Sequence, residues 1–100
     1  MIDFARIAGF DWDDGNRRKS LDKHAVSQWE AEQIFTDERI LIASDIAPSA
    51  AEPRYQALGE TVDGRMLHIS FTLRRNDTLI RVISARDMNR KERARYERQA

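Results

Sequence analysis

The chain has 100 residues, of which 41% are hydrophobic and 34% are charged, and its formal net charge is zero. This length suits one domain, so we expect residues 1–100 to form a single α+β domain around one modest core. The absence of cysteine excludes disulfides and thiolate chemistry. The two histidines are far apart and lack the spacing of a metal site. We find neither a signal peptide nor an apolar run of the ~20 residues that span a membrane, and we expect a cytosolic protein.

Charge divides the chain into two unlike halves. Residues 1–50 carry 6 basic and 10 acidic side chains, whereas residues 51–100 carry 11 basic and 7 acidic ones. Ten of those 11 basic residues are arginine, which binds phosphate through two hydrogen bonds at once. This uneven distribution of charge fits either a solvated surface that is simply polarised or a surface that binds a negatively charged partner.

The first half predicts one short strand and two helices. An apolar start at 10–12 indicates an edge strand, and Asp13 or Asp14 can begin a helix that runs to about His24. Ser27 and Glu30 have the spacing of a capping box, which predicts that a second helix begins there. An apolar stripe follows at helical spacing, and Trp29 lies off it, over a core edge or a partner surface.

The second half predicts antiparallel strands and a terminal helix. Asp63-Gly64 is a type I′ hairpin signal, Asn76-Asp77 predicts another turn, and Asn89 with Glu92 resembles a helix cap. We expect strands at 39–46, 54–62, 65–74 and 79–86, a loop at 47–53 and a helix after Asn89. The terminal helix has little apolar face, so it is either lightly docked or completed by a partner.

The strand at 79–86 carries the most informative pair of polar residues. Ser84 and Arg86 are two positions apart, so they share a face, and we expect them to continue the face of Ile80 and Val82. An arginine there can stabilise charge on a phosphate, and a serine can orient it. On spacing alone, the preferred alternative is that the serine simply ends the strand and the arginine bridges to the terminal helix. Arg81 alternates with Ile80 and Val82, and we expect it on another face, in a structural or partner-binding role.

Two histidines and one further arginine have less defined roles. Arg54 opens its strand, but its neighbours depend on a register that the sequence does not give. His24, together with Lys23, fits the end of a helix, where a cation is favoured, and this structural interpretation is preferred to the alternative of a proton shuttle. His68 lies in mid-strand on a polar face, with no motif around it.

Several of these segments together resemble the BrnT toxin family. In the first half the resemblance rests on Phe10-Asp11-Trp12-Asp13, on Lys23-His24-Ala25-Val26-Ser27-Gln28, on Glu30-Ala31 and on Phe35. In the second half it rests on Glu52-Pro53-Arg54-Tyr55, Gly59, Phe71-Thr72, Ile80-Arg81-Val82-Ile83-Ser84-Ala85-Arg86, Glu92-Arg93 and Tyr96. Ala25 replaces the glycine that is usual in the family after the Lys-His pair, and Ser20 and Asn16 also depart from its pattern.

The resemblance implies a RelE-like fold and a toxin that cleaves RNA, without a metal or other cofactor, to inhibit translation. It also implies a BrnA-type antitoxin, which as a dimer would neutralise the toxin and, bound to it, repress their shared operon through the antitoxin's own DNA-binding domain. By position, the active site would contain Arg54, Ser84 and Arg86, with Lys23 and His24 as further candidates. We expect Arg74, Arg75, Arg90 and Lys91 to bind RNA, and Trp29 and Tyr96 to contact the antitoxin. The alternative is a binding module without catalysis, such as a degenerate toxin that acts only as a co-repressor.

Overall fold

The computed structural model describes residues 3–13, 24–45 and 53–99. The expected first helix lies outside these ranges except at its two ends, and the expected loop at 47–53 lies outside them except for Pro53. Lys23 also lies outside the described residues. A short 3₁₀ turn, η1 (Phe4–Arg6), comes first, and strand β1 (Gly9–Phe10) follows it. The remaining elements are helix α2 (Gln28–Gln33), the 3₁₀ turn η2 (Ile34–Thr36), strands β2 (Leu41–Asp45), β3 (Arg54–Glu60), β4 (Met66–Arg74) and β5 (Leu79–Asp87), and helix α3 (Arg90–Arg98).

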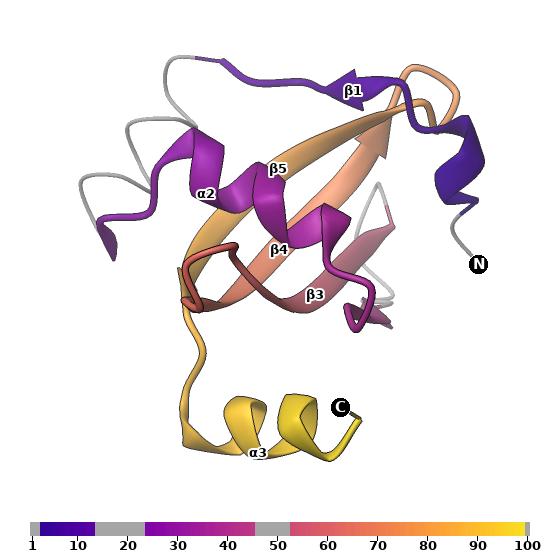
Figure 1. The fold of residues 1–100 in the computed structure, drawn as a ribbon. Coiled ribbons are helices and arrows are strands. Elements are labelled where there is room, and N and C mark those ends of the chain that lie inside the picture. Colours follow the sequence, from indigo (N-terminus) through magenta and orange to yellow (C-terminus); the bar gives the residue numbers. More distant parts are fainter. Residues whose placement is uncertain (1–2, 14–23, 46–52, 100) are drawn as a thin grey trace.

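The five strands form one sheet in the order β1-β5-β4-β3-β2. Neighbours from β2 to β5 are antiparallel, as expected, because short connections join them. The N-terminal β1 instead pairs in parallel with the start of β5, Gly9 with Leu79 and Phe10 with Ile80. This parallel edge strand closes one side of the sheet, and β2 forms the other side (Figure 1).

Helix α2 covers one face of the sheet and buries the main core (Figure 1). Ser27 and Glu30 form the expected capping box, which fixes where the helix begins. Gly59 of β3 lies so close to η2 that a Cβ there would come within 2.8 Å of the Ile34 Cβ. The core combines three residues of the α2 and η2 region with seven of the sheet: Val26, Ala31, Ile34, Ala57, Leu67, Ile69, Phe71, Ile80, Val82 and Ala85.

Helix α3 packs on the opposite face and buries a second, smaller cluster (Figure 1). Leu58, Met88 and Tyr96 form this cluster, with Leu41 and Met66 at its margin. Asn89 and Glu92 form the second capping box, which confirms the predicted start of the helix. Tyr96 is only 1% exposed, and its hydroxyl donates a hydrogen bond to an Asp37 carboxylate oxygen. The helix is therefore docked on its own sheet, and the expectation that Tyr96 lies on a surface open to the antitoxin is wrong.

The hairpin between β3 and β4 also differs from the expected type I′ turn. Only Gly64 has a positive φ, 89°, whereas a type I′ turn needs two such residues. The Gly64 N–H donates to the Thr61 carbonyl, and the Thr61 N–H donates to the Arg65 carbonyl. The result is a longer loop of the kind in which a left-handed glycine forms a bulge. The turn after β4 is where expected, and its Arg75, Asn76 and Asp77 all have positive φ.

Candidate active site

The face of the sheet under α3 carries most of the residues singled out in the sequence. In strand register, Ser84 pairs with Ser70, and Ser70 pairs with Gln56. The Ser70 hydroxyl donates a hydrogen bond of 2.8 Å to the Gln56 side-chain oxygen. Two residue pairs further along, and so on the same face, Arg86 lies opposite His68. Ser84 and Arg86 thus share a face, as their spacing predicts.

A bulge in β5 decides which face that is. Ser70 pairs with Ser84 but Phe71 pairs with Val82, so Ile83 has no partner of its own. Val82 and Ala85 therefore both face the core below α2, and Ser84 and Arg86 face the other way. The expectation that they continue the face of Ile80 and Val82 is wrong, because it assumes unbroken alternation.

Arg81 lies on the same face as Arg86, contrary to the sequence-based expectation. It pairs with Thr72, which alternates with the core residue Phe71. Its guanidinium forms ion pairs with Asp11, at 3.2 Å, and with Asp13. These contacts tie β5 to the segment after β1, and they agree with the structural role that the sequence left open.

Arg54 also lies on the α3 face, since it is two residues from Gln56 on β3 and strand residues two apart share a face. Arg54 and Arg86 stand on opposite sides of the row that joins Gln56, Ser70 and Ser84. From strand geometry, their backbones are separated by ~13 Å along the strands and ~10 Å across them. The two arginines therefore bracket the serine row and do not converge on one atom.

Arg86 is held by the terminal helix. Its two terminal nitrogens donate to the two carboxylate oxygens of Glu92, at 2.8 and 3.0 Å. The ion pair raises the pKa of Arg86 and lowers that of Glu92, so both groups stay charged. The bridge to the terminal helix, one of the two roles open from the sequence, is thus present in the structure.

His68, which no motif identifies, lies beside this ion pair. Its Nε2 is 3.7 Å from a Glu92 oxygen, and its side chain is 13% exposed. Burial lowers the pKa of His68, the neighbouring Arg86 lowers it further, and the imidazole is neutral at pH 7. The only signal in the sequence was a lone histidine on a polar strand face, which has no meaning until register places it beside Arg86.

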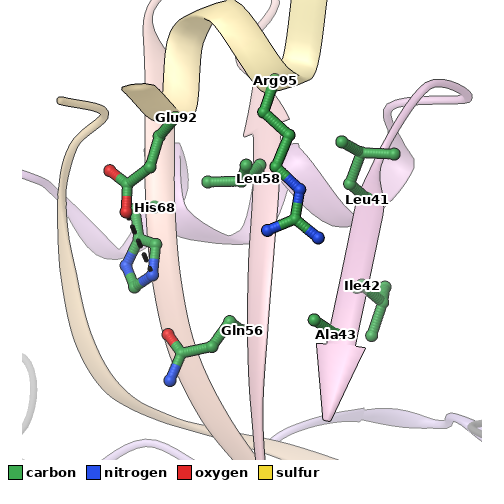
Figure 2. A pocket seen from close by; sticks show the side chains of 8 residues that line it. All are labelled: Leu41, Ile42, Ala43, Gln56, Leu58, His68, Glu92 and Arg95. Carbon is green, nitrogen blue, oxygen red and sulfur yellow. Dashed lines mark ion pairs between the residues drawn. The ribbon is translucent and has the colours of Figure 1, made fainter. Parts of the chain in front are cut away.

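A pocket opens beside His68, between α3 and strands β2, β3 and β4 (Figure 2). Its volume is about 250 Å³. Glu92 and Arg95 reach it from the helix, and Gln56 and His68 from the sheet (Figure 2). Leu41, Ile42, Ala43 and Leu58 form the apolar remainder of its wall.

His24 lies at the same end of β5 as Arg86 but on the other side of the strand. It is exposed, and its carbonyl accepts a hydrogen bond of 3.1 Å from Arg65. Arg65 also pairs with Asp87 at 2.7 Å and with Glu30 at 3.1 Å, so it fastens the α2 cap to the sheet. Ala25, which replaces the usual glycine, has a φ of 53°, a region that favours glycine.

The four residues expected to bind RNA form two separate pairs. Arg74 and Arg75 lie at the turn between β4 and β5, whereas Arg90 and Lys91 begin α3. The length of β5 separates these pairs by ~26 Å. Trp29 on α2 is 70% exposed, as its position off the apolar stripe predicts.

Comparison with solved structures identifies the class of fold. A crystal structure of the Brucella abortus ribonuclease toxin BrnT superposes with a TM-score of 0.56 and 20% sequence identity, over 82% of this chain and 97% of that one. A search of the curated proteins found no match. The fold is thus that of a small α+β ribonuclease toxin.

The family follows from the sequence match. Residues 12–92 match the model of the ribonuclease toxin BrnT of type II toxin–antitoxin systems. The chain belongs to this family, which confirms the resemblance noted in its sequence, and membership implies an antitoxin partner. In the part of the chain that the structure describes, no helix is long and apolar enough to cross a membrane.

Proposed function

We propose that this protein is a metal-independent endoribonuclease that acts in the cytoplasm and inhibits translation. The observation that carries the proposal is the polar α3 face, where Arg54 and Arg86 bracket the row that contains Ser84. An RNA strand that lies across this row meets a cation on each side of it. Family membership supports RNA as the substrate.

Cleavage by the RNA's own 2′-hydroxyl suits such a face. The 2′-hydroxyl loses its proton to a base as its oxygen bonds to the adjacent phosphorus, and negative charge builds up on the phosphorane. The bond from phosphorus to the 5′-oxygen then breaks and that oxygen takes up a proton, which leaves a 2′,3′-cyclic phosphate on one fragment and a 5′-hydroxyl on the other. Arginines stabilise that charge, and one well-placed donor contributes ~3–4 kcal/mol. Ser84 would orient the phosphate, and the exposed His24 is the candidate proton carrier, with Lys23 beside it in the sequence. Arg74 and Arg75 at one end, and Arg90 and Lys91 at the other, would hold the RNA on either side.

In this proposal Arg86 both pairs with Glu92 and contacts the phosphate of the RNA. Glu92 occupies both of its terminal nitrogens, so a phosphate has to compete for them or accept hydrogen bonds from other edges of the guanidinium. This contact is also the specific observation that favours the second candidate function, a non-catalytic toxin that survives as a co-repressor. In that case Arg86 would serve only to hold α3.

Substitutions at Arg86 and Glu92 separate the two functions. For a nuclease, Arg86→Ala lowers RNA cleavage at least 100-fold, because it removes transition-state stabilisation. Glu92→Gln breaks the same ion pair but leaves the arginine, so it retains cleavage. Arg54→Ala should behave like Arg86→Ala, and growth arrest on expression should follow cleavage in each case. RNA recovered intact from the wild-type protein, though bound with strong salt dependence, would establish the binding module instead.

The antitoxin of the proposed complex is of the BrnA type, which as a dimer would neutralise the toxin and recruit it to operator DNA. Trp29 is the proposed contact, because a tryptophan so exposed is typical of interfaces. Trp29→Ala should weaken antitoxin binding at least tenfold and leave stability within about 0.5 kcal/mol. Gln28→Ala on the same helix is the matched control, and equal affinities for both variants would remove Trp29 from the interface. The likeness to the RelE fold stays a prediction.

A further inference from the structure

The pocket beside His68 combines two apolar walls with a small set of polar groups. Leu41 of β2 lies on one side, His68 and Glu92 lie on the other, and Leu58 of β3 lies between them (Figure 2). A wall of this kind accepts a flat, apolar ring face, and the polar groups can pair with its edge. At about 250 Å³ the pocket is smaller than sites for drug-sized ligands, which begin near ~300 Å³, and suits one ring system.

The charges in the pocket exclude a phosphate as its main occupant. Glu92 is ionised, because Arg86 lowers its pKa, and its carboxylate would repel an anion. Arg95 brings one cation from α3, and neutral His68 brings none. The pocket thus offers hydrogen-bond donors and acceptors side by side, as the edge of a nucleobase requires.

One ring nitrogen of His68 lacks a hydrogen-bond partner among the described residues. Its Nδ1 is buried and makes no hydrogen bond within residues 3–13, 24–45 and 53–99. Buried polar atoms are nearly always paired, because desolvation without a partner is costly. Because Nδ1 is closed to solvent, a molecule in the pocket would meet the other ring nitrogen, Nε2, which lies 3.7 Å from a Glu92 oxygen.

The pocket adjoins the proposed cleavage site. His68 is the register partner of Arg86, and Gln56 belongs to the same row as Ser84. A nucleotide whose phosphate lay at the serine row would have its base within reach of the pocket between β3 and α3. We infer that this pocket binds a single nucleobase of the RNA next to the scissile phosphate. The inference rests on the proposed ribonuclease function and gives it a base-binding subsite.

Direct binding of nucleotides tests the subsite without cleavage. The four nucleoside 5′-monophosphates are added to the purified protein, and the imidazole signals of His68 and the methyl signals of Leu41 and Leu58 are followed by NMR. A His68→Gln variant distinguishes the signals of His68 from those of His24. At least one nucleotide should shift these signals in a saturable manner, whereas ribose 5-phosphate, which has no base, should not. An equal effect of ribose 5-phosphate would overturn the inference.

Matched variants place the binding in this pocket. Ala43→Leu extends into it from β2, and Ser44→Leu adds the same side chain on the opposite face of that strand. Ala43→Leu should raise the dissociation constant at least fivefold, and Ser44→Leu should leave it unchanged. If Ala43→Leu does not fold, Arg95→Gln takes its place, because Arg95 lines the pocket but is exposed and its replacement should not affect folding. Arg98→Gln, also exposed on α3, is its control.

Each outcome separates the subsite from the proposed function. Nucleotide binding that Ala43→Leu removes, in a protein that cleaves no RNA, supports the pocket and overturns the nuclease. Cleavage by a protein whose pocket signals respond to no nucleotide overturns the pocket alone. Pocket signals that respond only to the antitoxin would assign the cavity to that partner and would also overturn the inference.

Discussion

The two faces of the sheet are built from the same strands but from different kinds of side chain. The face below α2 is apolar and closed, and Phe71 at its centre contacts the rings of Phe35 and Tyr55. The face below α3 has a smaller apolar cluster, and beyond it come serines, arginines and His68. Since strands alternate, one face can supply stability while the other presents polar groups on a rigid support.

The largest expected effect tests the division of stability between the faces. Phe71→Ala opens a cavity in the α2 core and should lower the free energy of unfolding by about 3–5 kcal/mol. Ser70→Ala, the adjacent residue on the other face, removes one hydrogen bond and should cost about 1 kcal/mol. Urea unfolding measures the free energy of unfolding of both variants. Equal decreases would contradict the view that the α2 face supplies most of the stability.

The next effect concerns the apolar part of the α3 face. Burial and the hydrogen bond to Asp37 raise the pKa of Tyr96 to about 12. Tyr96→Phe removes that bond and should cost about 1.5–3 kcal/mol, because the acceptor is charged. Tyr55→Phe, whose ring packs on Phe71, should cost little. Antitoxin affinity, measured where both variants are folded, should not change; a loss of affinity at unchanged stability would return Tyr96 to the interface.

The smallest effect is a pH dependence confined to the polar face. The folded chain holds the pKa of His68 below 6.5, mainly through burial. The unfolded chain therefore takes up a proton first as the pH falls through 6.5, and stability declines until the folded-state pKa is also passed. His68→Gln should flatten the dependence of the unfolding free energy on pH in this window. A profile that His68→Gln does not alter would show that His68 is solvated.

Local chemistry made much of the fold readable from the sequence. The capping boxes at Ser27 and Asn89 and the turn at Asn76 each depend on groups within a few residues, and all three are present. The family, too, followed from residues in sequence order, because the motif at 80–86 and its neighbours keep their spacing. The first helix falls outside the described residues and stays a prediction.

Only the tertiary structure decided how the polar face is assembled. The bulge at Ile83 reverses the side on which Ser84 and Arg86 lie, and it depends on pairing with β4. Docking of α3 buries Tyr96 and brings Glu92 to Arg86 and His68. Each of these facts depends on contacts between segments that the sequence does not order in space, since a side-chain pattern specifies alternation but not register. The sequence by itself therefore determined the family and the candidate residues, and the packing of β4, β5 and α3 determined which of them meet.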